Sequence, residues 1–136
     1  MAFHPYLFFA GNCREAFTRY QEIFGGELFL ITNKDMPENE RMPGVHDDLI
    51  MHASLTVDGN LLMGSDDPST DSPGAVQGMQ VNFSVPDVAD AQRAFTALSD
   101  GGQVNMPIEQ TSWSPAFGMC TDRFGTPWMI SADSAG

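Results

Sequence analysis

The side chains of this chain best suited to acid–base chemistry or to metal binding are its three histidines. An imidazole titrates near neutral pH and binds borderline divalent cations. His4 precedes an apolar run, His46 lies in the acidic segment VHDD, and His52 opens the segment HASLTV. We interpret His46 as a solvated loop residue, because neighbouring acidic residues in a loop are a weak signal for a cation. For His52 two interpretations stay open, a ligand-contacting or acid–base group and, as the favoured one, a cross-strand hydrogen bond.

A second group of side chains suits the binding of a small apolar molecule. Pockets for small molecules combine aromatic and apolar walls with a few polar groups. The aromatic and thioether candidates are Tyr6, Phe8, Met63, Trp113, Phe117, Trp128 and Met129, and the polar candidates are His52, Gln80 and Asn82. Core packing is the competing interpretation, which we favour for Phe8, Phe117 and Trp128 and leave open for Trp113.

Two runs of the chain, residues 5–66 and 79–132, must position these groups, and each reads as strand, helix, strand and hairpin. Apolar side chains recur at alternate spacing in the strands and at helical spacing in the helices. The first run predicts a helix between Asn12 and Gly25 and strands over 5–10, 27–32, 50–57 and 60–65. The second predicts a helix between Asp87 and Gly101 and strands over 79–85, 103–108, 116–121 and 126–132.

Local signals mark the ends of these elements. Asn12 and Glu15 match a capping box at the start of the first helix, and Asp87 is a good cap for the second. The Gly25-Gly26 pair is expected to end the first helix through a residue in the left-handed conformation. The segment 33–48 holds two prolines and five acidic residues. We therefore expect it to be a long exposed loop, of the kind that often serves as a lid or a binding loop.

The repeat predicts an α+β protein of two tandem βαβββ modules that form a cupped mixed sheet. We expect a single domain over residues 1–136, with module one over 1–66, a linker over 67–78 and module two over 79–133. The length of the chain suits one domain and is too short for two independent ones. A cupped sheet is a place where small molecules bind, which limits the functions worth considering.

Strand alternation predicts which side chains lie on the side of each sheet away from the helix. For the strand over 60–65 both registers stay open, Leu61 with Met63 or Leu62 with Gly64. In the other strands the side chains expected on this side are His52, Ser54, Thr56, Gln80, Asn82, Ser84, Met129 and Ser131.

Composition excludes some classes of partner. The chain has a net charge of −12 and only six Lys and Arg, so a nucleic acid is a poor partner. Its apolar runs are of strand length, so we expect no membrane span. Its N-terminus lacks the pattern of a secretory signal. The two cysteines, Cys13 and Cys120, do not make a disulfide framework, and a reducing cytoplasmic location is the simplest expectation.

Three segments together resemble a known family. They are PYLFFAGNCREAFTRYQEIFGGEL at 5–28, HASLTVDGNLLMGSD at 52–66 and TSWSPAFGMCTDRFGTPWMIS at 111–131. With the repeated helix and glycine pair, they resemble the vicinal oxygen chelate superfamily of glyoxalase I, extradiol dioxygenases, fosfomycin resistance proteins and bleomycin-binding proteins. Within it the chain is similar to the PhnB-like branch. The resemblance implies the paired-module fold, a small-molecule ligand and a homodimer.

Some PhnB-like proteins are labelled 3-demethylubiquinone-9 3-methyltransferase, and we judge that activity a poor match to this chain. A methyltransferase that uses S-adenosylmethionine binds its cofactor at a glycine-rich turn within a longer parallel sheet. The sequence has neither that turn nor that length.

The resemblance also implies a divalent metal held by His, Glu or Gln side chains from four strands. In metal-dependent relatives a Glu lies seven residues after the Asp that opens the final turn, and counting from Asp122 leads to Met129. A thioether is a poor ligand for Ni²⁺, Zn²⁺, Mn²⁺ or Fe²⁺. His4 lies one residue out of the family's spacing. We therefore favour no metal, with His4, His52 and Gln80 as weak candidate ligands.

The sequence thus predicts a small-molecule binding protein of the glyoxalase and bleomycin-resistance type, without the usual catalytic metal. The alternative is a metal-dependent lyase, isomerase or dioxygenase of the same superfamily. We assign no catalytic residue. The residues expected to contact the ligand are Tyr6, His52, Met63, Gln80, Asn82, Trp113 and Met129.

Overall fold

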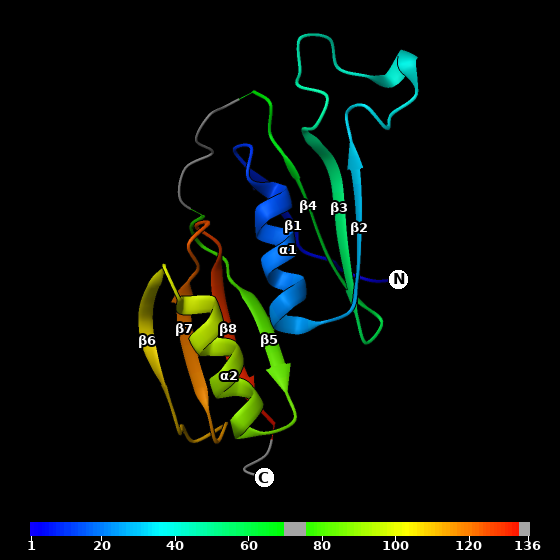
Figure 1. The fold of residues 1–136 in the computed structure, drawn as a ribbon. Helices are drawn as coiled ribbons and strands as arrows, with labels where there is room; N and C mark the ends of the chain where they lie inside the picture. The colour runs from blue at the N-terminus through cyan, green and yellow to red at the C-terminus, as the bar shows by residue number, and fades with distance from the viewer. Residues whose placement is uncertain (70–75, 134–136) are drawn as a thin grey trace. The chain divides into compact units, whose positions relative to one another are not determined.

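A computed structural model describes residues 1–69 and 76–133 and divides the chain into two compact units, residues 1–74 and 75–136. Each unit contains one four-stranded sheet and one α-helix (Figure 1). The predicted α+β class and the repeated βαβββ module are confirmed. The grouping of both modules into a single domain stays a prediction, and the predicted linker at 67–78 lies partly outside the described residues.

The first unit follows the order that the sequence predicts. Its elements are β1 (Tyr6–Phe9), α1 (Cys13–Phe24), β2 (Glu27–Thr32), a short 3-10 helix (Glu38–Glu40), β3 (Ile50–Val57) and β4 (Asn60–Asp66). The strands lie in the order β1-β4-β3-β2. The β1 strand runs parallel to β4, and the other neighbours are antiparallel. Figure 1 shows α1 in front of β1, so one face of this sheet is covered by the helix.

The core of the first unit lies between α1 and this covered face. The side chains buried there include Leu7, Phe9, Ala53, Leu55, Ala16, Phe17 and Tyr20. Gly64 of β4 allows the close approach. A Cβ atom there would lie 2.7 Å from the carbonyl oxygen of Leu7 and 2.8 Å from the ring of Phe17, distances that ordinary packing does not permit.

A buried carboxylate of β4 caps the first helix, which corrects the capping box predicted for Asn12 and Glu15. The Asn12 side chain makes no capping hydrogen bond. Instead Asp66 Oδ1 accepts hydrogen bonds from the backbone N–H of Cys13 at 2.9 Å and of Gly11 at 3.0 Å. At the other end, Gly25 has a positive φ of 75° but a ψ of −157°. That is not the left-handed helical conformation, whereas Gly26, the other glycine of the predicted pair, has a φ of 87°.

The predicted loop at 33–48 is organised around one buried amide. Asn33 is 2% exposed. Its side-chain Nδ2–H donates to the carbonyl oxygens of Met42 and Val45, each at 3.3 Å, and its Oδ1 accepts from the N–H of Met42 at 3.0 Å. These hydrogen bonds tie the start of the loop, at Asn33, to residues near its other end.

The second unit repeats the topology. Its elements are β5 (Val81–Val85), α2 (Val88–Ser99), β6 (Gln103–Glu109), β7 (Phe117–Thr121) and β8 (Pro127–Ala132), with strand order β5-β8-β7-β6. Asp87 caps α2 as predicted, because its Oδ1 accepts from the N–H of Asp90 at 2.9 Å. The β5 strand begins two residues later than the predicted 79.

The core of the second unit is centred on Trp128. Its side chain is 1% exposed, and its indole Nε1–H donates to Asp122 Oδ2 at 2.9 Å. Asp122 Oδ1 accepts from the N–H groups of Phe124 and Thr126, so this carboxylate holds the final turn. Among residues 1–69 and 76–133, neither helix has the length and apolar character that a membrane crossing requires.

Candidate functional site

The face of the first sheet opposite α1, which we call the first open face, carries several of the predicted ligand contacts. One row across the sheet contains Tyr6, Met63, Ser54 and Phe29, which are paired strand to strand. The adjacent row, with Leu7, Gly64 and Ala53, points toward the helix. The structure thereby selects the register with Leu61 and Met63 on the open face of β4.

Tyr6 and His52 form a polar pair on the first open face. Tyr6 Oη lies 3.2 Å from His52 Nδ1, and the two ring centroids are 5.8 Å apart. β4 separates β1 from β3 in the sheet, so this hydrogen bond spans an intervening strand. The cross-strand hydrogen bond favoured for His52 is confirmed. A histidine held in this way presents one oriented imidazole to a ligand.

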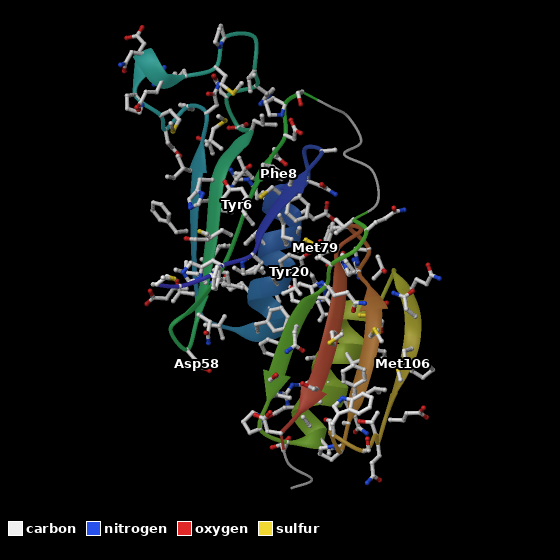
Figure 2. All side chains as sticks on the ribbon, turned by 180° about the vertical axis from the view of Figure 1, so that it is seen from behind. Tyr6, Phe8, Tyr20, Asp58, Met79 and Met106 are labelled. Atoms are coloured by element: carbon white, nitrogen blue, oxygen red, sulfur yellow. The ribbon has the colours of Figure 1, made fainter. Side chains whose placement is uncertain are left out.

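Other aromatic side chains lie on the same face of the sheet as this pair. Phe8 lies next to Tyr6 with ring centroids 5.3 Å apart, and Figure 2 shows both along β1. Tyr6 is 38% exposed, Phe8 60% and Phe29 59%. The core position favoured for Phe8 is therefore wrong. Alternation along β1 buries Leu7 and Phe9 and leaves Phe8 on the open face.

The other two histidines are not part of this hydrogen bond. His4 is exposed in the segment before β1. His46 is exposed in the loop, where its Nδ1 accepts from the N–H of Asp48 at 3.1 Å. That contact fits the local loop role predicted for His46.

The face of the second sheet opposite α2, the second open face, carries amides, hydroxyls and thioethers. One row pairs Asn82 with Met129 and Met129 with Met119. Gln80 Nε2 lies 3.3 Å from Met119 Sδ. The next row places Ser84 beside Ser131, with their hydroxyl oxygens 3.2 Å apart.

Trp113 is presented by a tightly bonded turn. It is 68% exposed, and its ring meets Phe117 edge to face with centroids 5.3 Å apart. The hydroxyl of buried Ser114 donates to the carbonyl oxygens of Ala116 at 2.8 Å and Ala132 at 2.7 Å. Trp113 is thus an ordered surface group, whereas Trp128 is a core residue, as favoured.

Sequence reasoning missed several residues of these faces, among them Phe29 and Met119. Phe29 stands between Leu28 and Leu30, and alternation places it on the side of its partner Ser54. Met119 follows Phe117 by two residues and shares its side of β7. Period-two alternation was the signal in both cases.

Comparison with known proteins agrees with this architecture. Residues 2–130 match the model of the Glyoxalase/Bleomycin resistance protein/Dioxygenase superfamily. The chain belongs to this superfamily. It is 34% identical over 140 residues to protein YjdN of Escherichia coli (strain K12), covering 96% of this chain and 95% of the relative.

Two solved structures extend the superfamily comparison. Protein PA1353 from Pseudomonas aeruginosa is 41% identical with a TM-score of 0.88, and the match covers 98% of each chain. The PhnB protein from Bacillus cereus, which carries the provisional name 3-demethylubiquinone-9 3-methyltransferase, is 21% identical with a TM-score of 0.70. That match covers 97% of this chain and 99% of the PhnB chain, and it shows a shared fold. The predicted resemblance to PhnB-like proteins is confirmed.

The donors of the two open faces do not fit the divalent metal that this superfamily is expected to hold. Over the described ranges, 1–69 and 76–133, no three His, Cys, Asp or Glu side chains gather into a metal site. Met129 lies between Asn82 and Met119, an amide and two thioethers that suit borderline cations poorly. The Nδ1 of His52 is engaged by Tyr6.

Neither cysteine of this superfamily member is a suitable nucleophile. Cys13 and Cys120 are both free and buried. Burial, with a smaller contribution from Asp122, raises the pKa of the Cys120 thiol to about 11. Burial also raises the pKa of Cys13, with Asp66 adding to the effect. Because only a thiolate is a good nucleophile, both thiols are packing residues.

Proposed function

We propose that this chain is a small-molecule binding protein whose open sheet faces hold the ligand without a catalytic metal. The observation that carries the proposal is the aromatic cluster on the first open face, where Tyr6, Phe8 and Phe29 are all exposed around a histidine. Exposed apolar groups gathered on one face mark an interaction site more often than scattered ones do. Apolar walls with one oriented polar group are the composition of a small-molecule site.

The second open face supports the same function with different groups. Its side chains offer amide donors and acceptors at Gln80 and Asn82, hydroxyls at Ser84 and Ser131, and polarizable sulfur at Met129. Thioethers adapt their shape to flat apolar ligands. The thioether of Met129 stands where metal-dependent relatives are expected to carry a Glu, which favours binding over metal chemistry.

The second candidate function is a metal-dependent lyase, isomerase or dioxygenase, and membership of the superfamily favours it. This alternative would use His4, His52 and Gln80 as part of a ligand set. The two functions differ in one measurable property, the retention of a metal. We do not propose a methyltransferase, because the chain has no glycine-rich turn for the nucleotide part of the cofactor.

Metal retention distinguishes the two functions. The untagged protein is loaded separately with Zn²⁺, Ni²⁺, Mn²⁺ and Fe²⁺, desalted, and measured by plasma mass spectrometry. We expect each metal to remain at background. His52→Ala is the test variant, and His46→Ala is the matched control, since it removes an exposed histidine from the loop. About one metal per chain, lost in His52→Ala and kept in His46→Ala, would overturn the proposal.

We also infer that the protein is a cytoplasmic homodimer. The resemblance to its superfamily supports the dimer, and the exposed ring of Phe3 offers apolar surface for it outside the proposed ligand contacts. The free thiols of Cys13 and Cys120 support a reducing location. Sedimentation equilibrium at micromolar concentration should give twice the chain mass of 14.8 kDa. A single species at the chain mass would contradict the dimer.

A further inference from the structure

Glu109 and Trp113 are both neighbours of Phe117 in the second unit. Glu109 ends β6 and is the direct cross-strand partner of Phe117. Directly opposed residues of an antiparallel pair share one face of the sheet. Trp113 meets Phe117 edge to face, with ring centroids 5.3 Å apart. The group therefore combines one carboxylate with two aromatic rings.

The strands that the structure describes offer no Lys or Arg side chain that would balance an anion. The chain has six Lys and Arg, and none of them lies within any of the eight strands. Three are held by acidic partners on helices or turns, as Arg19 is by Glu22, Arg93 by Asp90 and Arg123 by Asp100. Arg41 donates to backbone carbonyls of the loop. A ligand on either open face thus meets no cationic strand residue.

The charge of the whole chain acts in the same direction. A net charge of −12 raises the local concentration of small cations and repels small anions. An organic cation gains attraction from the face of a Trp or Phe ring as well as from a carboxylate. A ligand that carried a carboxylate or phosphate would gain neither the attraction to the aromatic rings nor the attraction to the carboxylate.

We propose that Glu109, Trp113 and Phe117 bind the cationic head of a ligand held on the second open face, so that the ligand class is an organic cation such as an alkylated ammonium compound. This inference rests on the proposed binding function and adds the charge of its ligand. Glu109 supplies the counter-charge, and Trp113, held by the Ser114 turn, supplies an ordered ring face. The ring of Phe117 packs against Trp113 and is itself only 7% exposed.

Choline and its uncharged isostere 3,3-dimethyl-1-butanol test this assignment. Each is titrated into the ¹⁵N-labelled full chain, and amide and indole shifts are followed by NMR, with acetate as the anionic probe. We expect choline to shift the Trp113 indole and the amides of 109–117, with an affinity at least about threefold above that of the alcohol. Acetate should leave these signals in place. Equal binding of choline and the alcohol, or no choline shift in this segment, would overturn the inference.

Two charge-matched variants locate the effect. Glu109→Gln should lower choline affinity about three- to tenfold and leave the alcohol unchanged. Glu38→Gln removes the same charge from the 3-10 helix of the first unit and should change neither. An equal loss in both variants would show a diffuse charge effect and contradict the site.

If choline fails to bind while neutral aromatic fragments still shift open-face amides, this inference falls and the binding function stands. Metal retention that depends on His52 would instead remove the binding function.

Discussion

Asp66 is the side chain with the largest predicted effect on stability. Its two oxygens accept hydrogen bonds from the backbone N–H groups of Gly11, Cys13 and Ile50, all within 3.0 Å, and the residue is 5% exposed. It therefore ties the end of β4 to the start of α1 and the start of β3. No local pattern around Asn12 reveals this, because the cap is supplied from a strand more than fifty positions later in the chain.

Asp66→Asn should destabilise the fold by about 2–4 kcal/mol, because it turns an acceptor into a donor in front of buried N–H groups. The free energy of unfolding in urea gives the measurement. Asp67→Asn is the matched control, since in the described part of the chain the Asp67 carboxylate accepts from the exposed Ser69 and its change should cost far less. Similar costs for the two variants would contradict the role given to Asp66.

The buried thiol of Cys120 predicts a pH dependence of stability. Its pKa is raised to about 11, whereas an unfolded cysteine titrates near pH 8.5. Between these values the unfolded chain loses the proton and the folded chain keeps it. The stabilisation is thus complete below about pH 8.5 and is lost as the pH rises toward 11.

Comparison with Cys120→Ala isolates this effect from other titrating groups. Under reducing conditions, the stability of the wild-type chain should fall more between pH 7.5 and 10.5 than that of Cys120→Ala. Urea unfolding at both pH values provides the four numbers required. Parallel losses in the two proteins would show that Cys120 does not carry the dependence.

At the scale of elements, the two helices begin in different ways although their sequences look alike. Asp87 caps α2 with its own side chain, whereas Asn12 makes no such bond. Asp87→Ala should therefore cost about 1 kcal/mol. Asn12→Ala should cost clearly less, as measured by urea unfolding. An equal loss of stability in the two variants would indicate that the Asn12 side chain caps α1, against the structure.

Much of the strand pattern was predictable from the sequence, as were the bounds of α1. Period-two alternation gave the bounds of β2 and β3 as observed and assigned the open-face side chains of β3, β5 and β8. The register of β4 needed the structure, because Leu61, Leu62 and Met63 are all apolar and alternation cannot choose among them. Phe8 was misplaced for a related reason, since the run YLFF is apolar on both sides.

At the scale of the whole molecule, the fold and the family followed from the sequence, and the ligand did not. The repeat of two modules is visible in the sequence as apolar side chains at strand spacing and at helix spacing, and this spacing is a local property of the sequence. A ligand contact depends on which faces stay open and on their charge. Glu109 illustrates this, because its position beside Phe117 follows from an irregular β6–β7 register that no periodicity predicts.

The most direct test of metal-free binding is an NMR titration of the full chain with flat aromatic fragments such as 2-naphthol and indole. Each titration is run twice, once with EDTA and once with added Zn²⁺. We predict shifts at open-face residues of the strands, including Ser54, Asn82 and Ser131, with the same dissociation constant in both conditions. Shifts that occur only with Zn²⁺, or that miss the open faces altogether, would contradict the account.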